Sequence, residues 1–463
     1  MAAIAILIIG VEAVLLFLPE LMTRFAIKYS KFNRPMAFSW FKSTHFLILA
    51  LFISCANLTK TENESATNQM EQKNSKMDSA TAKQPTHVQD LVLGANRTET
   101  YLPLLQNKRI GVVGNPSSLI LKKIKPNGEK FYTHLVDSLL SRQVNIVKVF
   151  SPEHGFRGTA DAGEKVKDGK DPKTGLNIIS LYGSNKKPTS EQLKGIDLLV
   201  FDIQDVGVRF YTYIATLHYV MEAAAEQEIP VIVLDRPDPN GHYVDGPIME
   251  KEHTGFLGMH AGVPLVHGMT IGEYAQMING EKWLKNGIKT ELTVIPMENY
   301  THAMLYSLPV RPSPNLPNDT SINLYPSLGL LEGTNLNAGR GTDMQFQVIG
   351  SPLLPAAKYT FSYTPQLNFG SKSPKHNGEL CHGIDLRQTP RMSSVDLTWI
   401  IDAYHDHTKK EAFFNTSNFT AHAGTAQLQK QIEAGKTMDE IRESWQEGLD
   451  TFKEKRAKYL IYK

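Results

Sequence analysis

Between residues 109 and 296 the chain repeatedly alternates a short apolar run with a longer segment of helical periodicity. The apolar runs lie at 109–115, 144–150, 197–202, 229–235 and 291–296, and the helical segments at 133–142, 213–227 and 270–279. Such alternation is typical of parallel strands whose crossover helices cover the sheet. The sequence therefore predicts an α/β fold with a Rossmann-like, mostly parallel sheet.

Polar side chains follow four of these predicted strands. They are Asn115 after the first, Glu153 and His154 after the second, Asp202, Asp205 and Arg209 at and beyond the end of the third, and Asp235 at the end of the fourth. A single acid at a strand end is more often a helix cap or a turn residue. The carboxyl ends of parallel strands meet at one rim, where open α/β sheets bind ligands. Four polar strand ends therefore predict a ligand site.

Residues 151–158 (SPEHGFRG) are the most informative of these strand ends. The stretch directly follows an apolar run and then stops contributing core residues. Glu153 and His154 are both able to transfer protons near neutral pH when their surroundings tune them. The alternative is a solvated turn bounded by glycines.

The second part of the chain, 301–463, predicts a smaller α+β domain. Prolines within 309–317 exclude a helix there. Strand-like runs lie at 358–363 and 382–386, and helical patterns at 394–405, 425–432 and 438–462. The loop 331–342 carries Glu332, Asn335 and Arg340 among glycines, which suits a hydroxyl-rich ligand better than an apolar one. A surface glycine-rich loop is the alternative.

Several functional classes are excluded or disfavoured by the sequence. A net charge of +2 disfavours a nucleic-acid partner. The dinucleotide-binding and P-loop motifs are absent, so the fold class implies no nucleotide cofactor. His253, His260 and His267 recur every seven residues, which does not match a zinc motif, so we predict no metal and no cofactor. Two cysteines, Cys55 and Cys381, provide no disulfide framework.

Residues 1–55 are expected to be a signal or membrane segment. A basic stretch, an apolar run at 45–53 and Ser54-Cys55 resemble a bacterial lipoprotein signal, in which Cys55 is lipidated. Met36 begins a complete signal of this type, so the true start is expected at Met36. The alternatives are an incidental thiol at Cys55 and a transmembrane span at 2–18, which Glu12 makes costly. Either arrangement predicts export to the periplasm or cell envelope, with membrane anchoring.

Residues 56–87 are polar and lack any apolar period, which predicts a flexible linker. The folded part is expected to comprise a Rossmann-like catalytic domain at 88–300 and the smaller domain at 301–463.

Six stretches in a fixed order carry a family resemblance. They are 151–158 (SPEHGFRG), 202–213 (DIQDVGVRFYTY), 235–237 (DRP), 332–335 (EGTN) with 339–342 (GRGT), and 441–445 (IRESW). Together they resemble the exo-β-N-acetylmuramidase family called NamZ, formerly a domain of unknown function. The resemblance covers roughly residues 88–463.

The resemblance implies a glycoside hydrolase that releases N-acetylmuramic acid from the non-reducing end of peptidoglycan fragments by cutting its β-1,4 bond to N-acetylglucosamine. It also implies an active site in the cleft between a Rossmann-like domain and a smaller domain. The acid proposed as catalytic in the family falls on Glu153.

Glycoside hydrolysis usually requires a proton donor and a second group that supplies or activates the nucleophile. We predict Glu153 as the general acid, positioned by His154, and favour Asp205 over Asp202, Glu332 and Tyr211 as its partner. Catalysis assisted by the substrate's acetamido group is an alternative. The predicted substrate-binding residues are Asn115, Arg157, Asp202, Arg209, Tyr211, Tyr213, Arg311, Glu332, Asn335 and Arg340.

Within that set, Arg209, Arg311 and Arg340 are candidates for the lactyl carboxylate of muramic acid, because a guanidinium binds a carboxylate in bidentate fashion. Tyr211 and Tyr213 are candidates for stacking on the sugar. The sequence also allows two rival functions: a non-catalytic lipoprotein that binds cell-wall sugars, and an exported hydrolase of another kind.

Overall fold

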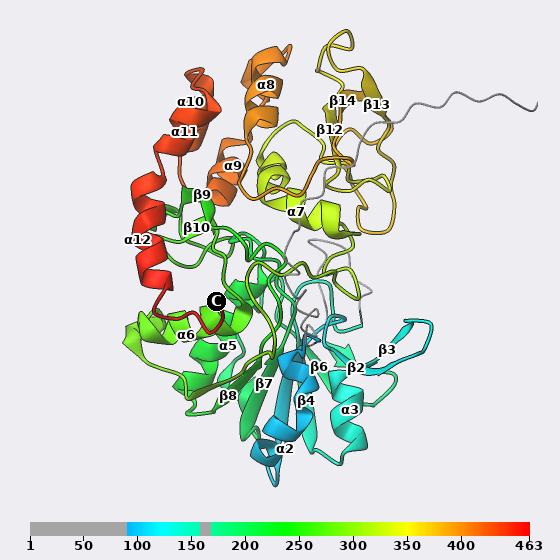
Figure 1. Ribbon diagram of the computed structural model, residues 1–463, viewed down its shortest axis with the longest axis vertical. Coiled ribbons are helices and arrows are strands. Elements are labelled where there is room, and N and C mark those ends of the chain that lie inside the picture. Colours follow the sequence, from blue (N-terminus) through cyan, green and yellow to red (C-terminus); the bar gives the residue numbers. More distant parts are fainter. Residues whose placement is uncertain (1–89, 158–167) are drawn as a thin grey trace, which may run out of the picture. The chain divides into compact units, whose positions relative to one another are not determined.

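A seven-stranded sheet forms the centre of the first part of the computed structural model, which describes residues 90–157 and 168–463 (Figure 1). Its strand order is β11-β8-β7-β1-β4-β6-β5, and the β5–β6 pair is antiparallel while the other neighbours are parallel. The bounds are β1 Ile110–Gly114, β4 Ile146–Ser151, β5 Gly169–Lys170, β6 Asn177–Ser180, β7 Leu198–Asp202, β8 Val231–Leu234 and β11 Leu292–Ile295. The predicted α/β class is confirmed.

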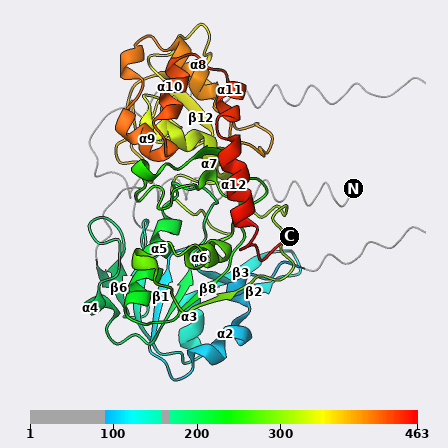
Figure 2. The ribbon, with the colours of Figure 1, turned by 90° about the vertical axis from the view of Figure 1, so that its left-hand side faces the viewer.

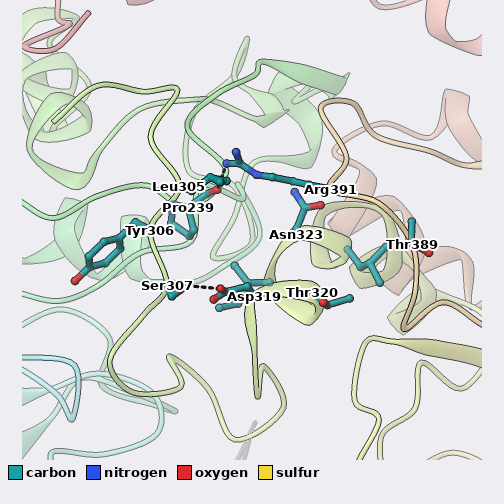
Figure 3. A pocket seen from close by; sticks show the side chains of 11 residues that line it. Pro239, Leu305, Tyr306, Ser307, Asp319, Thr320, Asn323, Thr389 and Arg391 are labelled. Atoms are coloured by element: carbon teal, nitrogen blue, oxygen red, sulfur yellow. Dashed lines mark hydrogen bonds between the residues drawn. The ribbon is translucent and has the colours of Figure 1, made fainter. Parts of the chain in front are cut away.

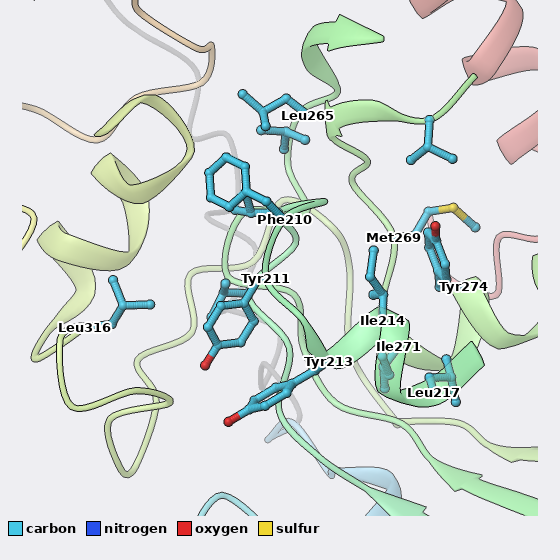
Figure 4. Close-up of a cluster of buried hydrophobic side chains, with 14 of the residues drawn as sticks. Phe210, Tyr211, Tyr213, Ile214, Leu217, Leu265, Met269, Ile271, Tyr274 and Leu316 are labelled. Carbon is cyan, nitrogen blue, oxygen red and sulfur yellow. The ribbon is translucent and has the colours of Figure 1, made fainter. Parts of the chain in front are cut away.

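Both faces of this sheet are covered by helices. Successive residues of β1 point to opposite faces, so Val112 packs in one apolar cluster and Val113 in the other. The helices are α2 (Thr98–Leu105) and α3 (Leu135–Ser141) on one face, and α5 (Tyr213–Glu226) and α6 (Ile271–Gly280) on the other. Figure 4 shows the second cluster around the first turns of α5 and α6. Burial on both faces explains why these strands are continuously apolar.

An antiparallel hairpin between β1 and α3 was not expected from the sequence. Its strands are β2 (Leu119–Ile124) and β3 (Lys130–His134). The predicted helix 133–142 therefore begins only at Leu135, where the His134 ring accepts a hydrogen bond from the amide of Val136. The Asn127-Gly128 turn was the signal that could have revealed the hairpin.

The remaining chain forms the expected smaller α+β domain. Its antiparallel sheet has the order β12-β14-β13. The strands are β12 Val348–Ser351, β13 Phe361–Tyr363 and β14 Cys381–Asp385. Its helices are α7 Asp319–Leu328, α8 Thr398–Asp406, α9 Thr416–Ala423, α10 Gln427–Glu433, α11 Met438–Glu443 and α12 Gln446–Arg456. A short pair, β9 (Asp245–Ile248) with β10 (Pro264–Val266), packs beside α12 (Figure 1).

The single helix predicted at 438–462 is wrong, because α11 and α12 are separate and α12 ends at Arg456. The Ser444 hydroxyl donates to the Ile441 carbonyl at 2.6 Å, a local bond that competes with helical hydrogen bonding. Beyond α12 the chain returns to the sheet domain, where the Tyr462 hydroxyl donates to Asp235 at 2.6 Å. The C-terminus is thereby fixed beside α6 (Figure 2).

The predicted segments 1–55 and 56–87 lie outside the described residues, as does Gly158. Within residues 90–157 and 168–463, no helix has both the length and the apolar character needed to cross a bilayer.

Candidate active site

A cavity of about 680 Å³ opens at the carboxyl end of the parallel sheet. The sheet domain contributes Glu153, His154, Tyr182, Phe210, Tyr211, Thr212, Phe256 and Leu257 to its lining. The smaller domain contributes, among others, Ser313, Tyr325, Glu332, Arg340, Phe346, Lys372 and His422. The cavity therefore occupies the cleft between the two domains, as expected.

Glu153 follows β4 and is half-buried at the cavity wall. Its Oε2 accepts a hydrogen bond of 3.0 Å from the Thr212 hydroxyl, at the start of α5. The Tyr213 hydroxyl lies 3.4 Å from the Glu153 carbonyl and fixes the backbone. Burial raises the pKa of Tyr182, and the neighbouring Glu153 carboxylate raises it further, so Tyr182 keeps its proton and can donate to Glu153. The carboxylate is thus oriented by α5 and by Tyr182.

His154 adopts a left-handed backbone conformation with φ of +71°. For a residue with a side chain this conformation costs about 1–2 kcal/mol, and such strain is often found at functional sites. The turn directs the chain sharply away from β4. His154 lines both the main cavity and a smaller one beside it.

Glu332 is the second acidic side chain among the described residues that line the cavity. The Arg340 Nε donates to its Oε1 at 2.7 Å. Burial raises the pKa of Glu332, but the charges of Arg340 and Lys375 outweigh burial and hold it below its ordinary value. Glu332 is therefore ionised at neutral pH.

The loop that carries Glu332 is wrapped around the Lys375 ammonium. Lys375 Nζ donates to the carbonyls of Leu331 at 2.7 Å and Thr334 at 2.6 Å, with longer bonds to two more carbonyls of the loop. Burial lowers the pKa of Lys375 to about 8. This arrangement gives the glycine-rich loop a defined shape.

Asp205, the predicted partner of Glu153, does not line the cavity, which corrects the sequence interpretation. It is buried, and its Oδ2 accepts the Gly207 amide at 2.8 Å. Its Oδ1 has no hydrogen-bond partner among the described residues, and His267 Nε2 lies 3.9 Å from Oδ2. An aspartate two residues before a glycine commonly caps its own turn, so the side chain folds back.

Asp202 and Arg209 also lie outside the cavity lining, contrary to prediction. Asp202 is fully buried against Arg236, whose Nε and Nη2 donate to its two oxygens at 2.6 and 2.9 Å. Arg209 is buried as well, and it donates to the backbone carbonyls of Pro247, Val263, His422 and Ala423. Both side chains are committed to the scaffold.

The two predicted tyrosines are placed differently. Tyr211 lines the cavity, and its hydroxyl donates to the Pro312 carbonyl at 2.7 Å. Tyr213 lies behind it, and its hydroxyl accepts a hydrogen bond of 2.9 Å from Asn115 Nδ2. Figure 4 shows both hydroxyls pointing away from the apolar cluster. Tyr213 and Asn115 therefore support the site rather than face the main cavity.

A side cavity of about 160 Å³ shares His154 and Ser313 with the main one. Asn115, Arg157 and Arg311 line it. Arg157 forms ion pairs with Asp137 and Asp171. Arg311 is exposed, and among the described residues its side chain donates one hydrogen bond, of 3.4 Å, to the Pro314 carbonyl. We define this space as the side cavity.

Asn335 lies away from both cavities. Its Oδ1 accepts a hydrogen bond of 2.6 Å from Ser351 and lies 3.1 Å from His407 Nε2. The side chain that was predicted to bind substrate joins segments of the smaller domain instead.

Several lining residues were missed by sequence reasoning, namely Tyr182, Thr212, Phe256, Tyr325 and His422. Phe256 lies between two glycines, Gly255 and Gly258, a pattern that could have indicated an exposed turn. The others carry no local signal.

A further cavity, of about 240 Å³, lies beside the first turns of α7 (Figure 3). Arg391 lies along one edge and donates to the Pro239 carbonyl at 3.1 Å, and Asp319 accepts a hydrogen bond from Ser307 on another side. Its lining contains none of the predicted site residues.

Two carboxylates facing one cavity among hydroxyl and aromatic side chains are the functional groups of a glycosidase. The fold and site thus define a glycosidase-like enzyme on a Rossmann-like scaffold. Sequence models of the exo-β-N-acetylmuramidase NamZ match the chain, the N-terminal one over residues 110–320 and the C-terminal one over 323–462. The chain belongs to this family of glycoside hydrolases.

Individual relatives agree with this assignment. The peptidoglycan β-N-acetylmuramidase NamZ of Bacillus subtilis (strain 168) is 40% identical over 380 residues, spanning 78% of this chain and 89% of that protein. The crystal structure of a DUF1343 family protein from Bacteroides fragilis NCTC 9343 superposes with a TM-score of 0.72 at 42% identity, covering 81% of this chain and 99% of that one. A second DUF1343 protein of that organism gives 0.68 at 27% identity, with the same coverage.

The burial of Asp205 leads us to expect a measurable pH dependence of the free energy of unfolding. Burial raises the pKa of its carboxyl to about 7, so folding favours the protonated form. The stabilisation is present below the ordinary carboxyl pKa and is lost as pH rises through about 7. Asp205→Asn mimics the neutral form. The free energy of unfolding of Asp205→Asn minus that of the unmodified protein should therefore increase as pH rises from 4 to 8, by roughly 4 kcal/mol at most.

Urea denaturation at several pH values measures this difference. Asp450→Asn, at an exposed position, serves as the matched control and should show a flat difference. A flat difference for Asp205→Asn as well would contradict the expected ionisation.

Proposed function

We propose that this protein is an exo-acting β-N-acetylmuramidase that releases N-acetylmuramic acid from the non-reducing end of peptidoglycan fragments, at the β-1,4 bond to N-acetylglucosamine. The observation that carries the proposal is the pair Glu153 and Glu332 in one cavity, in a chain of the NamZ family. The activity in the name of the B. subtilis relative supports it.

Glu153 acts as the general acid and transfers a proton to the glycosidic oxygen as the N-acetylglucosamine side leaves. The hydroxyls of Thr212 and Tyr182 hold its carboxyl group toward the cavity. A proton donor positioned in this way contributes about 10²- to 10⁴-fold to the rate.

Glu332 replaces Asp205 as the proposed partner of Glu153. Its ionised carboxylate is suited to activate water, to attack the anomeric carbon, or to orient the acetamido group of the substrate. Arg340 lies near both acids, since each of them raises the pKa of its guanidinium. The positive charge of Arg340 therefore helps to keep Glu332 ionised.

We propose Arg311 as the group that binds the lactyl carboxylate. Arg209 is buried among carbonyls, and the Arg340 Nε is engaged by Glu332. Arg311 is exposed in the side cavity, which shares His154 and Ser313 with the main cavity where the two acids lie. A guanidinium with little internal hydrogen bonding is suited to bidentate carboxylate binding.

Export is part of the proposal, with the enzyme anchored in the cell envelope by a lipid on Cys55. The apolar run 45–53 and Ser54-Cys55 support it.

The general-acid role predicts a dependence on the leaving group. Glu153→Gln should lower kcat/KM on the muramic acid–glucosamine disaccharide about 10³-fold, but much less on a nitrophenyl muramide, because nitrophenolate leaves without protonation. Glu332→Ala should lose activity on both substrates, and azide should restore part of it if the carboxylate acts as base or nucleophile. Release of muramic acid is the measurement.

Glu129→Gln, an exposed position in the β2–β3 hairpin, is the matched control and should retain full activity. Normal turnover of the disaccharide by Glu153→Gln would refute the assignment of Glu153.

Arg311→Met should lower kcat/KM for a nitrophenyl N-acetylmuramide by about 10²-fold, the loss expected for a charge-assisted bidentate pair. The value for the matching N-acetylglucosaminide, which lacks the lactyl group, should not change. Arg387→Met, at an exposed position paired with Asp385, is the control. An unchanged ratio of the two substrates would exclude Arg311.

Cys55→Ser should move the protein from the membrane to the soluble fraction and abolish incorporation of labelled palmitate. Both are read by fractionation of cells that express the full chain. Membrane association that survives the substitution would contradict anchoring through Cys55.

A further inference from the structure

Three aromatic side chains form a row that starts in the cavity beside Glu153. The ring centroids of Tyr182 and Phe256 are 6.2 Å apart, and Phe256 and Tyr219 lie nearly parallel at 6.4 Å. Tyr182 and Phe256 line the cavity, and all three rings are only partly buried. We call Tyr182, Phe256 and Tyr219 the aromatic row.

Phe256 is held rigidly in this row. Gly255 and Gly258 exchange two backbone hydrogen bonds of 2.9 Å, which makes a tight turn with Phe256 at its tip. The loop is closed at its base by Arg209, whose Nη1 donates to the carbonyls of Pro247 and Val263 at 2.7 and 2.8 Å. An aromatic ring fixed in place binds with little loss of conformational entropy.

A positive charge lies on the aromatic row. Lys186 Nζ is 4.1 Å from the centre of the Phe256 ring. The adjacent Lys187 is paired with Glu222 and Glu226, whereas the ion pairs formed by the described residues include none from Lys186. Lys186 is half-buried, and no carboxylate of the described residues pairs with its ammonium, which can therefore pair with an anionic ligand.

The orientation of the substrate follows from the two acids. Glu153, as general acid, lies at the leaving oxygen, and Tyr182 contacts Glu153 from the side of the aromatic row. Glu332 approaches from the smaller domain with Arg340. In the proposed reaction the sugar that is released as muramic acid would lie between the two acids, which directs the leaving chain toward the aromatic row.

We infer that the aromatic row binds the leaving glycan chain, and that Lys186 binds the lactyl carboxylate of the muramic acid two sugars away from the one released. This inference rests on the proposed function. Peptidoglycan glycan alternates the two sugars, so the first leaving sugar is neutral and the second carries a carboxylate. The apolar faces of the sugars pack on the rings, and Lys186 recognises the charge. The enzyme is thus selective for chain ends longer than a disaccharide.

The test compares initial rates of muramic acid release from the disaccharide and from the tetrasaccharide with two alternating repeats. The unmodified protein should show a higher kcat/KM on the tetrasaccharide, by about tenfold. Lys186→Met should remove most of this preference and leave the disaccharide value unchanged. Phe256→Ala should lower kcat/KM on both substrates.

Lys125→Met is the matched control, since Lys125 Nζ lies 4.4 Å above the Phe131 ring in the β2–β3 hairpin, outside the cavity lining. It should change neither value. Added salt should reduce the tetrasaccharide preference of the unmodified protein but not of Lys186→Met, because screening acts on the charge pair.

Equal kcat/KM on the two substrates, or an equal loss on both in Lys186→Met, would overturn this inference while the proposed function stands. Failure of the unmodified protein to release muramic acid from either substrate would overturn the proposed function and this inference with it.

Discussion

The buried ion pair between Arg236 and Asp202 is the interaction on which the active-site rim depends. Asp202 ends β7 and Arg236 follows β8, and the bidentate contact fixes the two strand ends against each other. Arg236 Nη2 also donates to the Leu119 carbonyl at 3.1 Å, which brings in the segment after β1. A buried charge of either sign would be costly without its partner. From this rim, Asn115 holds the Tyr213 hydroxyl near the Glu153 carbonyl, so the scaffold extends to the proposed acid.

The need to satisfy buried polar groups separates the polar residues of the rim into two sets: those that hold the scaffold together and those that line the cavity. Polar groups at the end of a covered sheet must be satisfied by each other or by a ligand. Arg236 satisfies both oxygens of Asp202, and the Gly207 amide satisfies one oxygen of Asp205. Glu153 follows β4, which lies two strands from β7 on the other side of β1, where the sheet meets the smaller domain and the cavity opens. The position of a strand in the sheet therefore decides which of these acids faces the cavity.

This division explains what could be predicted from the sequence. Continuous apolar strands and helix caps, such as the capping box of Thr270 and Glu273 at the start of α6, are local patterns, so the parallel sheet and its polar rim were predicted correctly. Asp205 and Glu332 look equivalent in sequence, and only the packing of distant segments separates them. The Asp205 side chain folds into its own turn, while Glu332 is carried to the cavity by a loop built around Lys375. Partners remote in sequence leave no local signal.

Arg209 illustrates how a scaffold residue still controls specificity. Its guanidinium contacts carbonyls rather than substrate, yet those carbonyls lie at both ends of the loop that presents Phe256 and at the end of α9. Burial lowers its pKa to about 9, so the charge is retained at neutral pH. Five donors on one rigid group satisfy several carbonyls at once, which a lysine cannot do with the same geometry. One buried side chain thereby couples the position of the aromatic row to the smaller domain that carries Glu332, and the cleft acts as one unit.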